Sequence, residues 1–339
     1  MTFVSLSRTR RSQPRTVILG TGSELPSKVM TNAALERLVD TTDEWITTRT
    51  GIKERRILEE GKGNADMAYR AALRALKDAG LEAKELEAII VGTVTPDYPF
   101  PSSACVLENL LGARNVFSFD VNAACSGFIN ALAVADSFIR TGMIRNALVV
   151  GSDVLSRMLN WKDRATCILF GDGAGAVVVG ASSDGARGVL STRLRTDGSY
   201  AKTLYVPAGG SLKPASPESV RRNEHTIAMN GKEVFKVAVR SMEEISREAL
   251  EEAGVGVEQL SLVIPHQANL RIITALAERL GVPMSKVMVN LDRYGNTSAA
   301  SVPVALDEAR REGRIRPGDI VLLNAFGAGF AWGAAVIRF

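Results

Sequence analysis

Short runs of aliphatic and β-branched residues recur along the chain, separated by segments in which apolar residues repeat every three or four positions. The short runs predict buried strands, at Thr16–Leu19, Ala88–Thr93, Val116–Val121, Ala147–Gly151 and Ala174–Val179. The three- and four-residue spacing predicts helices over Ile129–Arg140 and Val234–Glu252. This alternation is typical of an α/β fold with largely parallel strands.

An internal repeat indicates two similar halves. Ala75–Gly80 is echoed by Ala249–Gly254 at an offset of 174 residues, and Arg140–Arg145 is echoed by Arg311–Arg316 at an offset of 171. Two collinear matches at nearly one offset predict a duplicated unit whose copies meet near residue 184. We therefore expect a basic disordered tail at residues 1–15, an N-terminal half at 16–183 and a C-terminal half at 184–339, with a site at the junction of the halves.

Length and composition agree with a two-lobed globular protein. The chain has 339 residues, beyond the ~250–300 at which a single core stops growing, with 46% hydrophobic and 23% charged residues. No apolar run reaches the ~18–20 residues of a membrane span, so no membrane is expected. A net charge of +4 suits an acidic partner and is too small to indicate nucleic acid.

Three cysteines lie far apart in the sequence, at Cys105, Cys125 and Cys167. Their odd number and spacing argue against a disulfide framework or a metal site and favour a reducing cytoplasm. Cys105 and Cys167 lie within apolar segments, so we expect them to be buried structural residues.

Cys125 follows a predicted strand and precedes a predicted helix, between the small residues Ala123, Ala124, Ser126 and Gly127. Free N–H groups and the positive end of a helix dipole stabilise a thiolate, so this placement predicts a nucleophile with a pKa below the usual ~8.5. A buried cysteine acting as a small apolar residue fits the same position. Both interpretations stay open on position alone.

The chain has two histidines. His225 lies in a polar stretch and is expected to be exposed in a loop. His266 follows the apolar segment Leu260–Ile264 and stands at the carboxyl end of a predicted strand, where α/β sheets place ligand sites. A structural histidine is the alternative.

Asn296 belongs to the small-residue turn Gly295–Ser301, which opens another predicted helix. Helix capping would explain the asparagine by itself. The 171-residue offset, however, carries Cys125 onto Asn296. This match predicts that Asn296 is the counterpart of Cys125 in the second half, facing the same cavity together with His266.

Two glycine-rich runs resemble ligand-binding loops. Gly171–Ala176 fits a loose dinucleotide pattern, but a strand follows where that motif requires a helix, so we reject a nucleotide site. Phe326–Phe330 lies between two apolar segments and is either a tight turn or a source of backbone N–H groups for an oxyanion.

Taken together, these stretches resemble β-ketoacyl-acyl carrier protein synthase III, a family of initiating condensing enzymes in the thiolase superfamily. The resemblance runs from Thr16 to Phe339 and rests on Asp43–Ile46, Arg49–Ile52, Ala123–Gly127, Val150–Asp153, Phe170–Gly175, Pro265–Asn269 and Gly295–Ala299. It implies a five-layered αβαβα fold with two halves related by a pseudo-two-fold, a homodimer in the cytoplasm, and a catalytic triad of Cys125, His266 and Asn296.

The resemblance also implies binding residues. Trp45 and Arg164 resemble a pair that holds the adenine of coenzyme A, and Phe100 resembles a residue offered to the acyl pocket of a dimer partner. Other coenzyme A contacts are implied at Thr41, Arg49, Gly231 and Asn269. Contacts with acyl carrier protein are implied at Gln267, Ala268, Asn269, Leu270 and Arg271. Glu278 and Arg279 stand where relatives often have two lysines.

The implied reaction condenses a short acyl-CoA with malonyl-acyl carrier protein, with no metal or other cofactor. The backbone N–H groups of Cys125 and Ala328 would hold the oxyanion. Two alternatives remain at this point: a relative that makes polyketides or transfers acyl groups to oxygen or nitrogen, and a non-catalytic subunit that binds coenzyme A. The second would be expected to lack Cys125 or His266.

Overall fold

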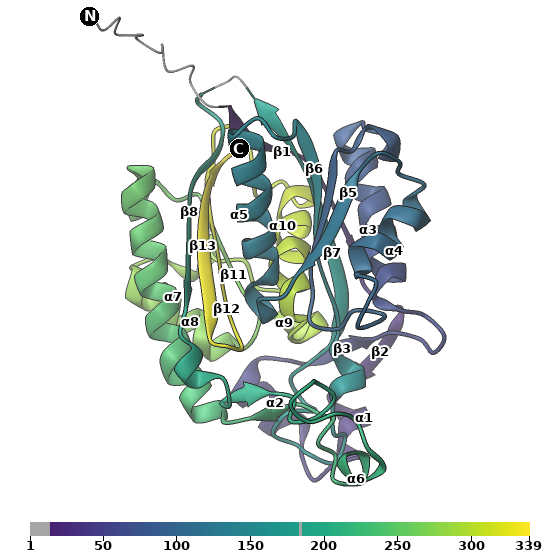
Figure 1. Cartoon of the computed structure of the whole chain (residues 1–339). Coiled ribbons are helices and arrows are strands. Elements are labelled where there is room, and N and C mark those ends of the chain that lie inside the picture. Colours follow the sequence, from purple (N-terminus) through teal and green to yellow (C-terminus); the bar gives the residue numbers. More distant parts are fainter. Residues whose placement is uncertain (1–13, 183–184) are drawn as a thin grey trace, which may run out of the picture.

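The computed structural model describes residues 14–182 and 185–339 in five alternating layers of helix and sheet. Figure 1 shows two sheets with helices α5 and α10 between them and further helices on both outer faces. The five-layered αβαβα thiolase-like fold is therefore confirmed. Most of the predicted tail lies outside the described residues, and Arg15 already belongs to the first strand.

The first sheet carries five strands in the order β1-β7-β6-β4-β5. They are β1 (Arg15–Glu24), β7 (Asp172–Ser182), β6 (Asn146–Val154), β4 (Ala88–Gly92) and β5 (Phe117–Val121). All five predicted strands are present. Only the pairings of β4 with β5 and with β6 are parallel, and β7 runs antiparallel to both of its neighbours.

The second sheet carries four strands in the order β11-β12-β13-β8. They are β11 (Leu262–Pro265), β12 (Ile320–Gly327), β13 (Ala331–Arg338) and β8 (Gly188–Thr196). One pairing, β11 with β12, is parallel. The prediction of largely parallel strands is thus wrong. A connection of three residues joins β12 to β13, and so short a link can only make an antiparallel pair.

Six long helices cover the sheets. On the outer face of the first sheet lie α3 (Asn64–Ala79) and α4 (Ser103–Leu111), and on that of the second lie α7 (Gly231–Ala253) and α8 (Leu270–Leu280). The central layer is α5 (Gly127–Arg140) with α10 (Ser301–Arg311). Both predicted helices are present, as α5 and α7. No helix in the described ranges combines the length and apolarity that crossing a bilayer requires.

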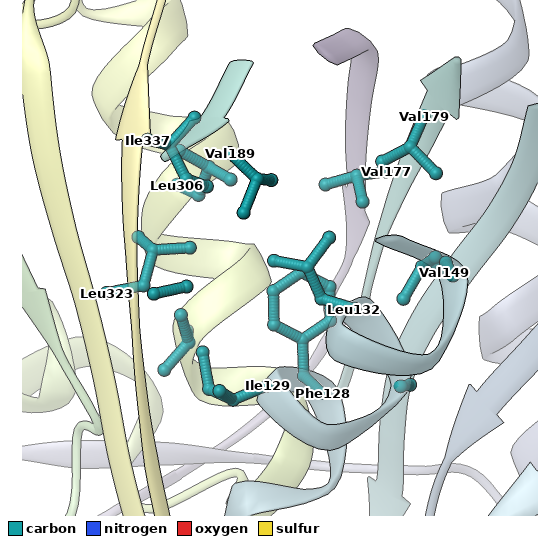
Figure 2. Packing of buried hydrophobic residues seen from close by; sticks show 14 of the residues in the cluster. Phe128, Ile129, Leu132, Val149, Val177, Val179, Val189, Leu306, Leu323 and Ile337 are labelled. Atoms are coloured by element: carbon teal, nitrogen blue, oxygen red, sulfur yellow. The ribbon is translucent and has the colours of Figure 1, made fainter. Parts of the chain in front are cut away.

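Helix α5 has apolar residues on two opposite sides, because it packs against both sheets. Figure 2 shows Phe128, Ile129 and Leu132 between residues of the first sheet and residues of the second. The labelled side chains from the sheets and α10 are Val149, Val177, Val179, Val189, Leu306, Leu323 and Ile337. This packing fixes the start of α5, which is where Cys125 lies.

Leu132→Ala is expected to lower the free energy of unfolding by about 2–5 kcal/mol, because Leu132 is fully buried and leaves a cavity between the sheets. Urea denaturation followed by circular dichroism measures the loss. Leu212→Ala is the matched control: Leu212 is 97% exposed, so a change within about 0.5 kcal/mol is expected. Equal stability of the two variants would contradict the observed packing of α5.

The two halves repeat one set of elements. The order β1-β7-β6-β4 of the first sheet matches β8-β13-β12-β11 of the second. The layers that hold α3, α5 and α4 in the first half hold α7, α10 and α8 in the second. The predicted boundary near residue 184 falls between β7 and β8. Because 183–184 lie outside the described residues, the boundary itself stays a prediction.

The repeat also corrects the predicted counterpart of Cys125. The single-turn helices Ala124–Ser126 and Ser298–Ala300 precede α5 and α10, and they are 174 residues apart. Cys125 therefore corresponds to Ala299, and Asn296 corresponds to Asn122. The offset of 171 arose because α10 has 11 residues and α5 has 14, so it applies only after these helices.

Smaller elements gather at one end of the molecule, at the bottom of Figure 1. They include α1 (Asn32–Glu36), α2 (Asp43–Thr50), β2 (Lys28–Thr31), β3 (Glu54–Ile57) and α6 (Pro217–Arg221). The strand pair β9 (Leu204–Tyr205) and β10 (Ala228–Met229) and the short helix α9 (Leu291–Tyr294) complete the fold.

Candidate active site

Cys125 lies in the single helical turn between β5 and α5, as the sequence predicted, and it is 7% exposed. The preceding Ala124 has φ +46°, a left-handed conformation that turns the chain sharply into the helix. The end of β12 packs directly on this turn. A Cβ at Gly327 would lie 2.5 Å from the Cys125 backbone nitrogen, so only glycine fits there.

His266 follows β11 and is 4% exposed. Its Nδ1 lies 2.6 Å from Ser301 Oγ, which also accepts the Gln267 N–H at 3.4 Å. The Ser301 hydroxyl proton is then available to Nδ1, so we assign the neutral tautomer that carries its proton on Nε2. Burial lowers the pKa of His266 to about 3, which keeps the imidazole neutral.

Asn296 follows α9 and is 6% exposed. Its backbone is fixed by hydrogen bonds to the segment before β7: its N–H donates to Leu169 at 2.8 Å, and its carbonyl accepts from Gly171 at 3.0 Å. Its side-chain Oδ1 accepts the Ser298 N–H at 2.8 Å. This contact leaves Nδ2, the donor end of the amide, available to a ligand.

The three side chains line one cavity of about 150 Å³. Cys125 comes from the N-terminal half, and His266 and Asn296 come from the C-terminal half. Most other lining residues are apolar, among them Leu169, Leu204, Met229, Phe235, Met242 and Ile272. The cavity thus combines one thiol and two neutral hydrogen-bond donors with walls suited to an acyl chain.

The thiol of Cys125 differs from the prediction of a depressed pKa. Burial raises the pKa of Cys125 to about 12, and the negative charge of Asp153 acts in the same direction. The hydroxyl of Ser298, 3.4 Å from Sγ, offsets part of this rise. The cysteine is therefore a neutral thiol at rest, and its proton has to leave when it reacts.

The other two cysteines behave differently from one another. Cys167 is buried, as predicted. Cys105 is exposed on α4, so the prediction of a buried residue is wrong. Its neighbours Ser103 and Ala104 are the residues of this turn that face the sheet, and Cys105 lies on the solvent side. His225 is exposed, as predicted.

The candidate coenzyme A residues form a cluster that reaches the cavity. Trp45 on α2 lies beneath two guanidinium groups, those of Arg49 at 4.3 Å and Arg164 at 5.1 Å from the ring centroid. Asn269, which lines the cavity, donates to the Arg49 carbonyl at 3.2 Å. Gly231 lines the cavity as well. Separately, Thr41 has a buried hydroxyl with no hydrogen-bond partner in the described chain.

The candidate carrier-protein segment has an internal and an external part. Gln267 is 1% exposed, and its amide donates to the carbonyls of Pro265 at 2.8 Å and Met288 at 3.0 Å. Its side chain thus supports the loop and cannot contact a partner directly. Ala268, Asn269 and Leu270 are partly exposed, and Arg271 is exposed.

Arg271 and Arg279 differ, although both lie on α8. Arg279 forms an ion pair with Glu243 of α7 at 2.9 Å. Arg271 makes no ion pair within residues 14–182 and 185–339, and Glu278 is exposed beside Arg279. Phe100, before α4, is 85% exposed.

Sequence reasoning missed three residues of the site. Ser298 contacts Cys125, Ser301 contacts His266, and the buried Asp153 accepts the Ala299 N–H at 3.1 Å. Asp153 and Ser298 lie in stretches that carried the family resemblance, and Ser301 lies two residues beyond one of them. Their contacts join residues far apart in the sequence, so spacing alone could not reveal them.

Comparisons with known proteins place the chain in a family. Models described as 3-oxoacyl-[acyl-carrier-protein (ACP)] synthase III and as its C-terminal part match residues 119–198 and 250–339. The β-ketoacyl-[acyl-carrier-protein] synthase III of Caldanaerobacter subterraneus is 56% identical over 321 residues, covering 95% of this chain and 97% of that protein.

Solved structures agree. The crystal structure of 3-oxoacyl-[acyl-carrier-protein] synthase III from Aquifex aeolicus is 53% identical, with a TM-score of 0.89 over 96% of this chain and all of that one. A priming β-ketosynthase of the R1128 polyketide pathway has the same TM-score at 37% identity, covering 96% of this chain and 97% of that one. Identity of 56% to a curated synthase, against 37% to the polyketide enzyme, favours the condensing enzyme over a polyketide specialist. The chain belongs to the β-ketoacyl-acyl carrier protein synthase III family.

Proposed function

We propose that the chain condenses a short acyl-CoA with malonyl-acyl carrier protein, releasing coenzyme A and CO₂ and giving a 3-oxoacyl-acyl carrier protein that starts fatty-acid synthesis. The observation that carries this proposal is the convergence of Cys125, His266 and Asn296 on one apolar cavity. A thiol can hold an acyl group covalently, and two neutral donors can stabilise an enolate. The proposed steps use no metal or redox group.

In the first step, Cys125 attacks the thioester carbonyl of the acyl-CoA. The backbone N–H groups of Cys125 and Ala328 stabilise the oxyanion, and coenzyme A leaves. The close packing of Gly327 on the Cys125 nitrogen supports this arrangement, because it brings the turn after β12 next to the nucleophile.

In the second step, the malonyl thioester enters and loses CO₂. Nε2–H of His266 and Nδ2–H of Asn296 donate hydrogen bonds to the thioester oxygen as the enolate forms. The enolate carbon then attacks the acyl group on Cys125. Neutral donors suit this step, because decarboxylation creates the carbanion without removal of a proton by a base.

Coenzyme A is proposed to lie with its adenine beside Trp45 and Arg164. A flat ring flanked by a guanidinium offers both stacking and cation–π contacts. Thr41, Arg49, Gly231 and Asn269 are proposed as further contacts along the path to the cavity. The unpartnered hydroxyl of Thr41 supports this role.

We also propose that the chain forms a homodimer in the cytoplasm. The exposed aromatic ring of Phe100 supports a contact with a second copy, since such a contact would remove its apolar surface from water. Analytical ultracentrifugation of the wild type and of Phe100→Asp would test this proposal.

Acetyl-CoA and malonyl-acyl carrier protein, incubated with the purified chain, test the main proposal. The expected product is the four-carbon 3-oxoacyl-carrier protein, identified by mass. A panel of straight and branched primers would then define the chain length that the cavity accepts. Transfer of the acyl group to an alcohol or amine, with no condensation product, would overturn the proposal.

Arg271→Glu is expected to raise the KM for malonyl-acyl carrier protein about tenfold, equivalent to about 1.4 kcal/mol. Acyl carrier proteins are acidic, and Arg271 is exposed without an ion pair in the described chain. Steady-state kinetics at low and high salt measure the effect, which should weaken as salt screens the charges.

A second substrate and a control variant distinguish a loss of carrier-protein docking from damage to the active site. Malonyl-CoA as the substrate should show little change in Arg271→Glu, because it lacks the carrier. Arg316→Glu makes the same charge change at an exposed position beside Phe339 and should behave like the wild type. Equal losses with both malonyl substrates would show that Arg271 supports the active site.

A further inference from the structure

Strand β6 ends beside the turn Ser298–Ala300, and two of its residues contact that turn directly. A Cβ at Gly151 would collide with the Ala299 carbonyl oxygen, so only glycine lets the turn lie this close to the strand. Asp153 is two positions further along and therefore points to the same side of β6. Its Oδ2 accepts the Ala299 N–H at 3.1 Å. One face of β6 is thus fitted to the turn.

The Asp153 carboxylate is fully buried and accepts three further hydrogen bonds. Its Oδ1 accepts from the Val94 N–H at 2.8 Å and from the hydroxyls of Thr95 at 2.9 Å and Thr93 at 3.0 Å. Each hydroxyl itself accepts an N–H from elsewhere in the chain, so its own proton is directed at Asp153. Four donors therefore converge on the two oxygens and fix the position of the carboxylate.

The turn connects Asp153 to the side chain of Asn296. Ser298 has φ +53°, a left-handed conformation that a residue with a side chain keeps only where its surroundings hold it. The Ser298 N–H donates to Asn296 Oδ1 at 2.8 Å, and this bond decides which way the amide group points. The direction of the Asn296 amide therefore depends on a turn that β6 holds.

We propose that Asp153 is a positioning residue for decarboxylation of the malonyl thioester. By holding the Ala299 N–H, its carboxylate keeps Nδ2 of Asn296 directed at the thioester oxygen. Asp153 is not among the residues that line the cavity, so it acts through the turn and does not touch the substrate. This inference rests on the proposed function, because that function assigns Asn296 to the enolate oxygen.

The same carboxylate affects Cys125 in the opposite sense. Burial raises the pKa of the Cys125 thiol, and the negative charge of Asp153 adds to this rise. Attack on the acyl-CoA thioester requires loss of the thiol proton, so the charge of Asp153 hinders acylation. Asp153 therefore favours the second step and opposes the first. General support of the fold would favour both steps equally.

Asp153→Asn breaks the link to the turn and removes the charge. The amide oxygen takes the place of Oδ1, where three donors converge, so the NH₂ group takes the place of Oδ2 and faces the Ala299 N–H. Two donors cannot bond to each other, so the turn loses this contact. We expect decarboxylation to be about 10–10²-fold slower, because a shift of about 1 Å at a reacting group slows a step this much.

Gly151→Ala displaces the same turn without changing any charge. Its Cβ would press on the Ala299 carbonyl, so decarboxylation should fall as it does in Asp153→Asn. The rate of acylation should stay at the wild-type value, because the charge near Cys125 is unchanged. This variant tests the role of the turn even where Asp153→Asn does not fold.

Asp307→Asn is the matched control for neutralising a buried carboxylate. Asp307 on α10 is 1% exposed, and its partners are Thr21, Ser23 and Arg311, which lie away from the turn. The control should be less stable than the wild type but should keep the wild-type rates of both steps.

Two measurements on each variant that is folded by circular dichroism separate the steps. Rapid-quench mixing with acetyl-CoA, followed by mass spectrometry of the intact protein, gives the rate of acylation. Release of CO₂ from malonyl-acyl carrier protein by the acyl-enzyme gives the rate of decarboxylation. In Asp153→Asn we expect acylation at the wild-type rate or faster, faster alkylation of Cys125 by iodoacetamide, and slower decarboxylation.

Equal losses in both steps of Asp153→Asn would overturn the proposal, since this result indicates general damage. A wild-type rate of decarboxylation in Asp153→Asn would also overturn it, as would the same result in Gly151→Ala where Asp153→Asn does not fold. These outcomes leave the proposed function intact while the wild type forms acyl-Cys125 and releases CO₂. Absence of both products in the wild type would instead refute the proposed function.

Discussion

His266→Ala and Asn296→Ala are each expected to lower the rate of malonyl decarboxylation by about 10²–10³-fold, while Cys125 still takes up an acyl group. Removing one donor to a developing oxyanion typically has an effect of this size. His266 is neutral and presents Nε2–H, and the Asn296 amide presents Nδ2–H. Each substitution therefore removes one such donor. Release of CO₂ and the mass of the acyl-enzyme measure the two steps separately.

His225→Ala is the control for histidine loss, because His225 is exposed in a loop and should show wild-type rates in both steps. Ser301→Ala should give a smaller loss of decarboxylation than His266→Ala, since it frees the imidazole to rotate but leaves it present. If His266→Ala and Asn296→Ala both fail to form the acyl-enzyme, these residues activate the thiol and the assignment of roles is wrong.

The alternation of strands and helices was predictable because its signals are local, whereas the five-layered arrangement was implied by the family resemblance. Strands β4, β6 and β7 carry apolar runs, and burial on both faces leaves little polar alternation to confuse the pattern. Strand direction was not predictable in the same way. β7 and β13 look like the other strands in sequence, and their antiparallel pairing depends on connections that periodicity does not encode.

The repeat pointed to a residue that lines the cavity, but through an incorrect correspondence. The offset of 171 pointed from Cys125 to Asn296, yet the matching turns pair Cys125 with Ala299. Asn296 nevertheless lines the cavity, three residues before Ala299 in the same turn. Sequence spacing could locate this turn, but it could not identify which of its side chains points inward.

Burial of individual side chains was the least predictable feature of the site. An apolar stretch indicates a helix with one buried face. A shift of one position along that helix moves a cysteine from the buried face to the exposed one. Cys105 and Ala104 are adjacent, and only Ala104 is buried. The pKa of Cys125 has the same origin: the helix N-terminus was visible in the sequence, but the desolvation that outweighs it was not.

Iodoacetamide is expected to abolish activity only when Cys125 is modified, although Cys105 should react first. Cys105 is exposed on α4, Cys125 is 7% exposed with a raised pKa, and Cys167 is fully buried. The thiolate is the reactive species, so exposure and pKa together should place Cys105 ahead of the other two. Peptide mass spectrometry at successive times, with activity measured in parallel, follows each thiol.

A Cys105→Ser background makes the correlation direct, since one accessible thiol then remains and the loss of activity should follow its labelling. Acetyl-CoA added beforehand should protect Cys125, because a sulfur that carries an acyl group cannot form the reactive thiolate. In the wild type, the same treatment should leave Cys105 fully reactive. Cys125→Ala should form no acyl-enzyme at all. Retention of full activity in a protein whose Cys125 is completely carboxamidomethylated would exclude this residue as the nucleophile, since the modified sulfur cannot accept an acyl group and no other cysteine lines the cavity.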